Sequence, residues 1–331
     1  MAAPSGQKPR PNRAPGREEG RGRTATRPHQ IPASGWRDIL ARIKQGLSDD
    51  HVSIVSAGVA FYALFALFPA LAAFVSIYGL ITDPTQVQQQ LSALSSLLPQ
   101  DAYALVQQQL KNVASQAGGA LTAGAIGALL LALWGATKGV KALFDALNIV
   151  YDEEENRSFF KLNALALLLT VGAILFGTFT LILIAALPAV LGNLGLSELV
   201  RNLLSFGRWP LLAVVLMLAL AVMYRFGPSR EQPQWRWVTW GAIAATLLWL
   251  IGSVAFSIYV SNFGSYDKTY GSMGAVVILL MWLYLSAYVV LLGAELNAET
   301  EHQTTQDTTT GAPERLGRRG AHVADSVGER H

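Results

Sequence analysis

Six long apolar runs constrain the fold of this chain more than any other feature of its sequence. None has a charged residue in its central part, and they cover about residues 52–81, 117–137, 162–190, 207–226, 236–261 and 272–297. A helix needs about 20 mostly apolar residues to cross the hydrocarbon core of a bilayer. A helix also satisfies its own backbone hydrogen bonds, which lipid cannot do. The sequence therefore predicts an all-α, polytopic membrane protein with six transmembrane helices.

The two ends of the chain differ from this apolar middle. Residues 1–34 are rich in Pro, Gly and Arg, whereas residues 299–331 are polar, Thr-rich and mixed in charge. Neither segment carries enough apolar surface to offset the entropy that is lost on ordering. We therefore expect a disordered basic tail, a single membrane domain over residues 35–298, and a second disordered tail.

Basic residues predict the orientation of the membrane domain. Of 25 Lys and Arg residues, 21 lie in the N-terminal segment, in residues 138–161, in residues 225–236 or in the C-terminal tail, and 4 lie in the other loops. Cytoplasmic loops of membrane proteins carry the excess of Lys and Arg. Both termini are accordingly predicted to be cytoplasmic. Residues 82–116 and 262–271 are predicted to lie on the outer side.

Amphipathic helices are expected beside the spans. In the N-terminal flank, apolar residues repeat at helical spacing: Trp36, Ile39, Leu40, Ile43 and Leu47. Such a helix lies on the inner leaflet or packs under the bundle, and the sequence leaves both readings open. The first outer loop, residues 82–116, has the pattern of two further amphipathic helices, which either cap the bundle or rest on the outer leaflet.

Small residues and one proline mark places where the spans can pack closely or bend. The small residues of the second span recur four apart: Gly119, Ala123 and Gly127, then Gly135 and Gly139. This spacing lets helix backbones approach each other within one chain or between copies, so homo-oligomerisation stays undetermined. Pro69 removes a backbone hydrogen bond deep in the first span and is expected to kink it near Phe65.

Several kinds of chemistry find no support in the sequence. The chain has no cysteine, which excludes disulfides, thiolate nucleophiles and Cys-based metal sites. The residues GATKGV around Lys138 lack the spacing of a phosphate-binding loop, which argues against an ATPase. The acidic run over residues 152–155 is interpreted as a solvated turn, with metal binding as the alternative. We expect no catalytic residue, no cofactor, no metal and no nucleic-acid partner.

Three polar side chains near the cytoplasmic ends of the spans are candidates for ligand binding. Lys138 and Lys141 follow Trp134 near the end of the second span. They either extend to the lipid headgroups or form a basic patch for an anionic ligand such as a phospholipid headgroup. Glu295 ends the sixth span, where it either meets the membrane interface or pairs with one of these lysines.

The stretch SNFGSYDKTYGSMGA, residues 261–275, joins the fifth and sixth spans. Its glycines permit turns, and irregular backbone at membrane depth must be buried in protein or line water. We consider two readings: a re-entrant hairpin that closes the bundle, and a substrate-facing gate in which Asp267 and Lys268 are the charged elements. The candidate ligand-binding or gating residues are Asn262, Gly264, Tyr266, Asp267, Tyr270, Gly271, Lys138, Lys141, Glu295 and Pro69.

Four segments together carry a resemblance to a known family. They are GVAFYALFALFPAL, LWGATKGVKALFDALNIVYDEEENRSF, YRFGPSREQPQWRWVTWGA and YVSNFGSYDKTYGSMGAVVILLMWLYLSAYVVLLGAELNAE. In order and spacing they resemble the YihY/virulence factor BrkB family of bacterial inner-membrane proteins, over roughly residues 40–299. The resemblance implies six spans in the inner membrane and no established activity. It also implies that an older label for the family, ribonuclease BN, is a misassignment.

The resemblance and the residues together lead to two hypotheses of function. The first is a transporter or lipid-handling protein of the cell envelope that does not hydrolyse ATP, with membrane lipids as partners and an unknown substrate. The alternative is a structural or regulatory scaffold of the envelope. Ribonuclease activity is disfavoured, because no nuclease constellation of residues is present.

Overall fold

The computed structural model describes residues 20–81, 123–181, 183–184, 197–262 and 272–330. Within these ranges the regular structure is helical, with one isolated β-bridge between Pro233 and Thr309. The helices are η1 Pro28–Gln30, α2 Ala33–Asp49, α3 Val52–Ile81, α6 Ala123–Val150, α7 Phe159–Leu181, α9 Glu198–Phe226, α10 Trp235–Asn262, α12 Ser272–Glu301 and α13 His322–Asp325. The prediction of an all-α protein is confirmed.

Long apolar helices account for most of the described residues. Four are long and apolar enough to cross a membrane, namely Phe159–Thr180, Glu198–Phe226, Trp235–Ser261 and Val276–Glu301. A fifth is present if Ala33–Asp49 and Val52–Leu67, which meet at an angle of 61°, form one broken span. The described residues therefore support four or five spans, and the prediction of six is not confirmed.

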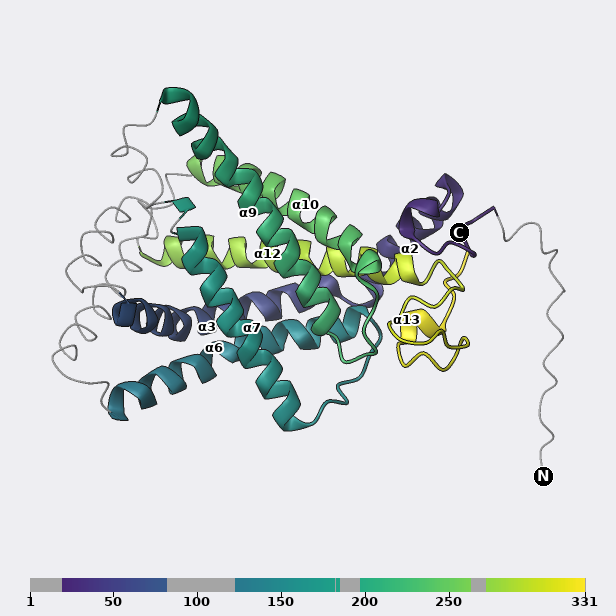
Figure 1. The fold of residues 1–331 in the computed structure, drawn as a ribbon, viewed down its shortest axis with the longest axis horizontal. Helices are drawn as coiled ribbons and strands as arrows, with labels where there is room; N and C mark the ends of the chain where they lie inside the picture. The colour runs from purple at the N-terminus through teal and green to yellow at the C-terminus, as the bar shows by residue number, and fades with distance from the viewer. Residues whose placement is uncertain (1–19, 82–122, 182, 185–196, 263–271, 331) are drawn as a thin grey trace.

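The long helices converge at one end and diverge toward the other (Figure 1). At the convergent end lie α2, α13 and the connections between α6 and α7 and between α9 and α10. Helix α12 runs through the middle and packs against α3, α10 and α2, while α6 packs against α3 and α7. This arrangement brings the carboxyl-terminal turns of α12 next to the junction of α2 and α3.

Glycines set the closest helix contacts, as the spacing in the second span predicts. A Cβ atom added to Gly139 would lie 3.0 Å from Cβ of Ala66, and one added to Gly135 would lie 3.0 Å from Cγ of Pro69. Helix α3 continues through Pro69, whose ring packs on α6. Gly127 has no such neighbour, and Gly119 is outside the described residues.

A tighter contact joins α10 to α12. A Cβ atom on Gly241 would lie 2.0 Å from the carbonyl oxygen of Gly293, which no side chain can occupy. Beside it, the Gly241 N–H donates to Asn297 Oδ1 at 2.7 Å, and Asn297 Nδ2 donates to the carbonyl of Val238 at 3.2 Å. Close backbone approach plus a buried amide therefore fixes the position of α12 against α10.

Helix α2 packs under the bundle and not only along a lipid surface. Ile39 and Ile43 are buried, with Leu292 and Leu296 of α12 packed against them. Leu40, which the pattern placed on the same apolar face, is 61% exposed. Of the two readings for the N-terminal amphipathic helix, the structure supports packing against the bundle.

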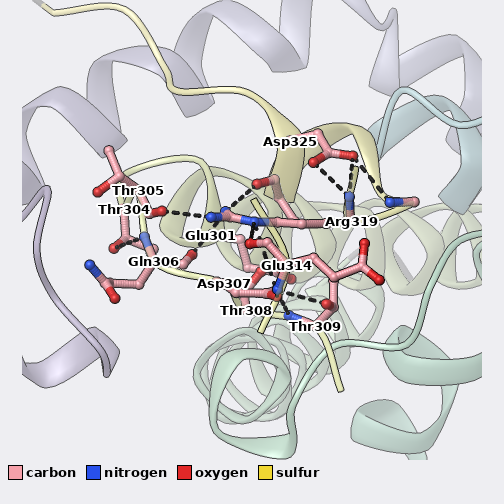
Figure 2. Close-up of polar contacts among 12 residues, drawn as sticks. Glu301, Thr304, Thr305, Gln306, Asp307, Thr308, Thr309, Glu314, Arg319 and Asp325 are labelled. Atoms are coloured by element: carbon pink, nitrogen blue, oxygen red, sulfur yellow. Dashed lines mark hydrogen bonds and ion pairs between the residues drawn. The ribbon is translucent and has the colours of Figure 1, made fainter. Parts of the chain in front are cut away.

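The C-terminal residues form an ordered cap, which differs from the disorder expected for them. Arg319 donates to the carbonyl oxygens of Thr305, Gln306 and Ala324, and Asp325 accepts from the backbone N–H groups of residues 317, 319 and 320 (Figure 2). Residues 20–32 join this cap, since Arg23 donates to the carbonyls of Gln303 and Gly328. Dense side chain to backbone hydrogen bonding orders a segment whose composition offers little apolar burial.

Candidate functional site

The junction of α2 and α3 is a sharp break in the helical backbone. Helix α2 ends at Asp49, and the N–H of the following Asp50 still donates to the carbonyl of Gly46 at 2.9 Å. His51 then adopts a positive φ of 49°, which a residue other than glycine rarely does, and α3 starts at Val52. The break interrupts the helix and brings the side chain of Asp50 to α12.

Asp50 meets a second carboxyl group at this break. Glu295 of α12 is 2% exposed, and its side chain lies within hydrogen-bonding reach of Asp50. Its Oε1 atom has no hydrogen-bond donor among the described residues. Two carboxylates have only acceptor oxygens, so they can form a hydrogen bond only when one of them carries a proton. The pair is therefore a place where a proton can be held.

Gly46 closes the site from the side of α2. A Cβ atom at this position would lie 3.1 Å from both Glu295 oxygens, so helix α2 rests directly on the carboxyl group. A side chain there would have to displace Glu295 or α2. The glycine, one turn before Asp50, thus lets α2 come close enough for the two carboxyl groups to meet.

The charged side chains that act on Glu295 are acidic, and the nearby Arg42 is paired with another of these acids. Asp50, Glu299 and Asp152 each disfavour a negative charge on it. Glu299, one turn further along α12, is paired with the Arg42 side chain, whose guanidinium also donates to Gln303 Oε1 at 2.8 Å and to the carbonyl of Glu329 at 2.9 Å. Arg42 is thereby committed to Glu299 and to the cap.

Glu301, a second buried carboxylate on α12, is paired with a cation instead of an acid. Glu301 and Arg230 are both fully buried, with 2.7 Å between Arg230 Nη2 and Glu301 Oε2. Thr308 Oγ1 donates to the same Glu301 oxygen at 2.8 Å, and the guanidinium lies 4.7 Å from the ring centre of Tyr151. Burial raises the pKa of Tyr151, so the ring stays neutral beside the ion pair.

The lysines predicted to pair with Glu295 lie elsewhere. Lys141 Nζ donates to Asn163 Oδ1 of α7 at 2.5 Å, and Lys138 Nζ sits 5.2 Å from the ring centre of Trp134. The pairing hypothesis was wrong, because the lysines face α7 and the bundle exterior while Glu295 faces the α2–α3 junction. Neither reading of the lysines themselves, lipid contact or anionic ligand, is decided by these contacts.

The predicted outer gate falls almost wholly outside the described residues. Gly264, Tyr266, Asp267, Tyr270 and Gly271 belong to residues 263–271, which the structure does not describe. Asn262 is the last residue of α10. The gate, and the two amphipathic helices of residues 82–116, therefore stay predictions.

The acidic run is engaged by neighbouring groups. Arg157 Nη2 lies 2.5 Å from Glu155 Oε2, and this hydrogen bond lowers the pKa of Glu155 to about 2. The N–H of His322 in the cap donates to Glu153 Oε1 at 2.7 Å. Burial nonetheless raises the pKa of Glu153. Over the described part of the chain, no group of three or more His, Cys, Asp or Glu is arranged to hold a metal ion.

Sequence reasoning did not identify Asp50, Arg42, Arg230 or Asn297 as members of one buried polar region. A partial signal was present, since the polar residues SDDH, 48–51, separate an amphipathic pattern from an apolar run and mark a break. The partner of Asp50 lies 245 positions further along the chain, and no local pattern indicates a contact at that separation.

Comparisons with known proteins agree on one family. The model of the family described as virulence factor BrkB matches residues 43–317. A Bacillus subtilis protein named as ribonuclease-like, YfkH, is 34% identical over 255 residues, 73% of this chain and 88% of that relative. A UPF0761 membrane protein of Photobacterium profundum is 26% identical over 280 residues, 83% of this chain and 84% of that relative. No solved structure matches the chain significantly.

Proposed function

The chain belongs to the virulence factor BrkB family, and we propose that it is a transporter or lipid-handling protein of the bacterial inner membrane that works without ATP hydrolysis. The observation that carries the proposal is the meeting of buried Glu295 with half-buried Asp50 at the break between α2 and α3. Ionisable groups within or beside membrane spans are costly and mark ion or substrate pathways. Transporters commonly build such sites where a helix is discontinuous.

The proposed topology has six spans, with α3 and α6 as the first two and both termini in the cytoplasm. The contacts of Arg23 with Gln303 and Gly328 support an even number of crossings, since they put the two ends of the folded chain on one side. The distribution of 21 basic residues against 4 favours the cytoplasm for that side.

Membrane lipids are the proposed partners, with an anionic phospholipid as a candidate ligand. Large apolar side chains stand exposed along α3 and α6, among them Phe61, Phe65, Leu131 and Trp134. Lys138 extends from the same face as Trp134. An apolar surface with a cation at its end is suited to an acyl chain and an anionic headgroup.

We propose no ribonuclease activity for this chain. The ribonuclease-like name belongs to the Bacillus subtilis relative. Here two of the four carboxylates in the acidic run 152–155, those of Glu155 and Glu153, are taken up by Arg157 and by the N–H of His322, and no group of three in the described residues could hold a metal ion. Phosphodiester cleavage by two metal ions needs free clustered carboxylates.

The test is phospholipid movement in reconstituted vesicles. The purified full-length protein is placed in vesicles of phosphatidylethanolamine and phosphatidylglycerol with a fluorescent phospholipid in one leaflet, and loss of leaflet asymmetry is followed. We expect movement well above that of protein-free vesicles, and its loss in a double variant Asp50→Asn, Glu295→Gln. Glu198→Gln, at an exposed position at the start of α9, is the matched control. Movement equal to that of protein-free vesicles, together with no co-purified phospholipid, would contradict the proposal.

The same purified protein also tests the alternative function, an envelope scaffold. A protein that co-purifies in a fixed ratio, without lipid movement, supports the envelope scaffold instead. Bound lipids are identified by mass spectrometry of protein extracted with its native membrane patch. A phospholipid headgroup that is found bound in every preparation would identify the class of substrate.

A further inference from the structure

We propose that Asp50 and Glu295 form a binding site for one proton, and that this proton is the coupling ion of the transport cycle. The first half of the inference stands on the geometry of the pair. The second half rests on the proposed function.

The lack of any basic partner for Glu295 among the described residues is what points to a ligand, since Glu301 Oε1 also has no donor but that carboxylate is paired with Arg230. The side chain is 98% buried (2% exposed), and Oε1 has no donor within the described residues. A buried carboxylate oxygen without a donor loses its hydration and gains nothing in return. A proton shared with Asp50 supplies the missing hydrogen bond and removes one of two adjacent negative charges.

The size of the site favours a proton over a metal cation. Ca²⁺ and Mg²⁺ in proteins take six or more ligands, mostly oxygen atoms, and Zn²⁺ takes four. A Cβ atom built on Gly46 would lie 3.1 Å from both Glu295 oxygens, so α2 leaves no room for a further ligand on that side of the carboxyl group. No third His, Cys, Asp or Glu completes a metal site in the described ranges. The two carboxyl groups facing each other can bind a proton without further ligands.

The charged groups on the neighbouring elements keep the proton in place at neutral pH. Asp49 faces Asp50 from the end of α2, and Asp152 faces the pair from the segment after α6. On α12 itself, Glu299 is held by Arg42 and lies 3.8 Å from His302 Nδ1. Tyr151, which also interacts electrostatically with Glu295, is neutral. The surrounding field is negative, so a second charge within the pair is disfavoured.

Loss of the proton changes the charge of the pair from −1 to −2. The proton passes to water, and the two carboxylates then repel each other across the contact between α2 and α12. Asp50 sits at the break, where the backbone already departs from helical geometry, so the repulsion acts on the junction that positions α2. Burial of Ile39 and Ile43 against Leu292 and Leu296 opposes it. Proton occupancy therefore sets whether α2 stays docked on α12.

Infrared spectroscopy of the full-length protein in lipid discs tests the site directly. At pH 7 we expect a carboxylic-acid C=O band equivalent to one protonated carboxyl group per chain, which is lost completely in Glu295→Gln. Glutamine has nearly the same shape and can donate to Asp50, so the fold is retained. Glu198→Gln, at an exposed position at the start of α9, is the matched control and keeps the band. A band of unchanged intensity in Glu295→Gln, or no band in the wild type, overturns the proton site.

A pH gradient tests the coupling separately. With one proton per cycle, a gradient of one pH unit across the vesicle membrane shifts the transport equilibrium about tenfold. We expect this shift in the wild type and its loss in Glu295→Gln. Lipid movement that ignores the gradient overturns the coupling and leaves the proposed function standing. An infrared band without any lipid movement overturns the proposed function and leaves the proton site standing.

Discussion

Two buried carboxylates on helix α12, six positions apart, are neutralised by different means. Glu301 has a guanidinium, that of Arg230, at 2.7 Å, and Thr308 donates to the same oxygen. Glu295 has no basic partner within the described ranges and faces another acid, Asp50. In the first arrangement a cation balances the buried negative charge. The second can lose or gain a proton, so one helix carries a structural carboxylate and a titratable one.

The contrast shows why burial by itself does not identify a functional carboxylate. Both side chains are buried to nearly the same extent, at 0% and 2% exposure. What differs is the side chain that each carboxylate meets. Arg230 neutralises Glu301 with its positive charge, whereas Asp50 cannot be positive, so a proton has to neutralise Glu295. Four changes, from the largest expected effect to the smallest, test this comparison.

Removing the cation from the structural pair has the largest expected effect. Arg230→Met leaves the Glu301 charge buried without compensation, which costs about 3–5 kcal/mol. Thermal unfolding in detergent measures the loss. Arg236→Met, at an exposed position, is the control and should change little. A cost below about 1 kcal/mol for Arg230→Met would mean that Glu301 also holds a proton, and the comparison would fail.

Crowding the α10–α12 contact should disturb both carboxylates together. A Cβ on Gly241 would lie 2.0 Å from the Gly293 carbonyl, and Gly241 also donates to Asn297, between the two acids. Gly241→Ala is expected to cost about 1–3 kcal/mol or more through displacement of α12. Gly172→Ala, in α7 where the added atom meets nothing within 4 Å, should be neutral or stabilising in the same unfolding assay. Equal stabilities for the two variants would contradict the contact.

Replacing Glu295 should change the pH dependence more than the stability. Glu295→Gln keeps a hydrogen bond to Asp50 without a proton, so stability at pH 7 is expected within about 1 kcal/mol of the wild type. A proton held in the folded state stabilises below the unfolded pKa, and that stability is lost as pH rises. The wild type should therefore lose stability as pH rises above the unfolded pKa of a glutamate, about 4.3, whereas the variant should not. If the stabilities of the wild type and the variant change with pH in the same way, the shared proton is contradicted.

The smallest effect is expected at an ion pair that reaches solvent. Arg157 lowers the pKa of Glu155 to about 2, so the pair contributes stability above the unfolded pKa and loses it only as pH falls toward 2. Solvent screens this pair, and Glu155→Gln should cost less than about 0.5 kcal/mol at pH 7. A cost comparable to that of Arg230→Met would show that exposure does not separate the two classes of pair.

Much of the apolar part of the molecule could be predicted from the sequence. The run 52–81 is helix α3, and the run 236–261 lies within α10, because a long apolar segment in lipid has few other ways to satisfy its backbone. Four-residue spacing indicated the close contacts of Gly135 and Gly139. The contact of Gly241 with Gly293 could not be found in this way, since the two glycines lie on different helices.

The polar end of the molecule was much harder to predict. A Thr-rich, charged composition indicates disorder when apolar burial is the criterion. The hydrogen bonds that the Arg319 side chain donates and the Asp325 carboxylate accepts nevertheless order residues 305–325 (Figure 2). Such bonds depend on which carbonyl lies within reach of which side chain. The lysine pairing of Glu295 failed for the same reason: being on one side of a membrane does not make two residues neighbours.

The sequence by itself determined that this chain is helical, apolar over most of its length and similar to the BrkB family, because these properties depend on composition and on local periodicity. Only the tertiary structure decided which carboxylate has a cation and which has another acid. That choice depends on the break after Asp49 and on the close approach of Gly46 to α12. The energy of a buried charge is set by atoms a few ångströms away in space, whatever their separation along the chain.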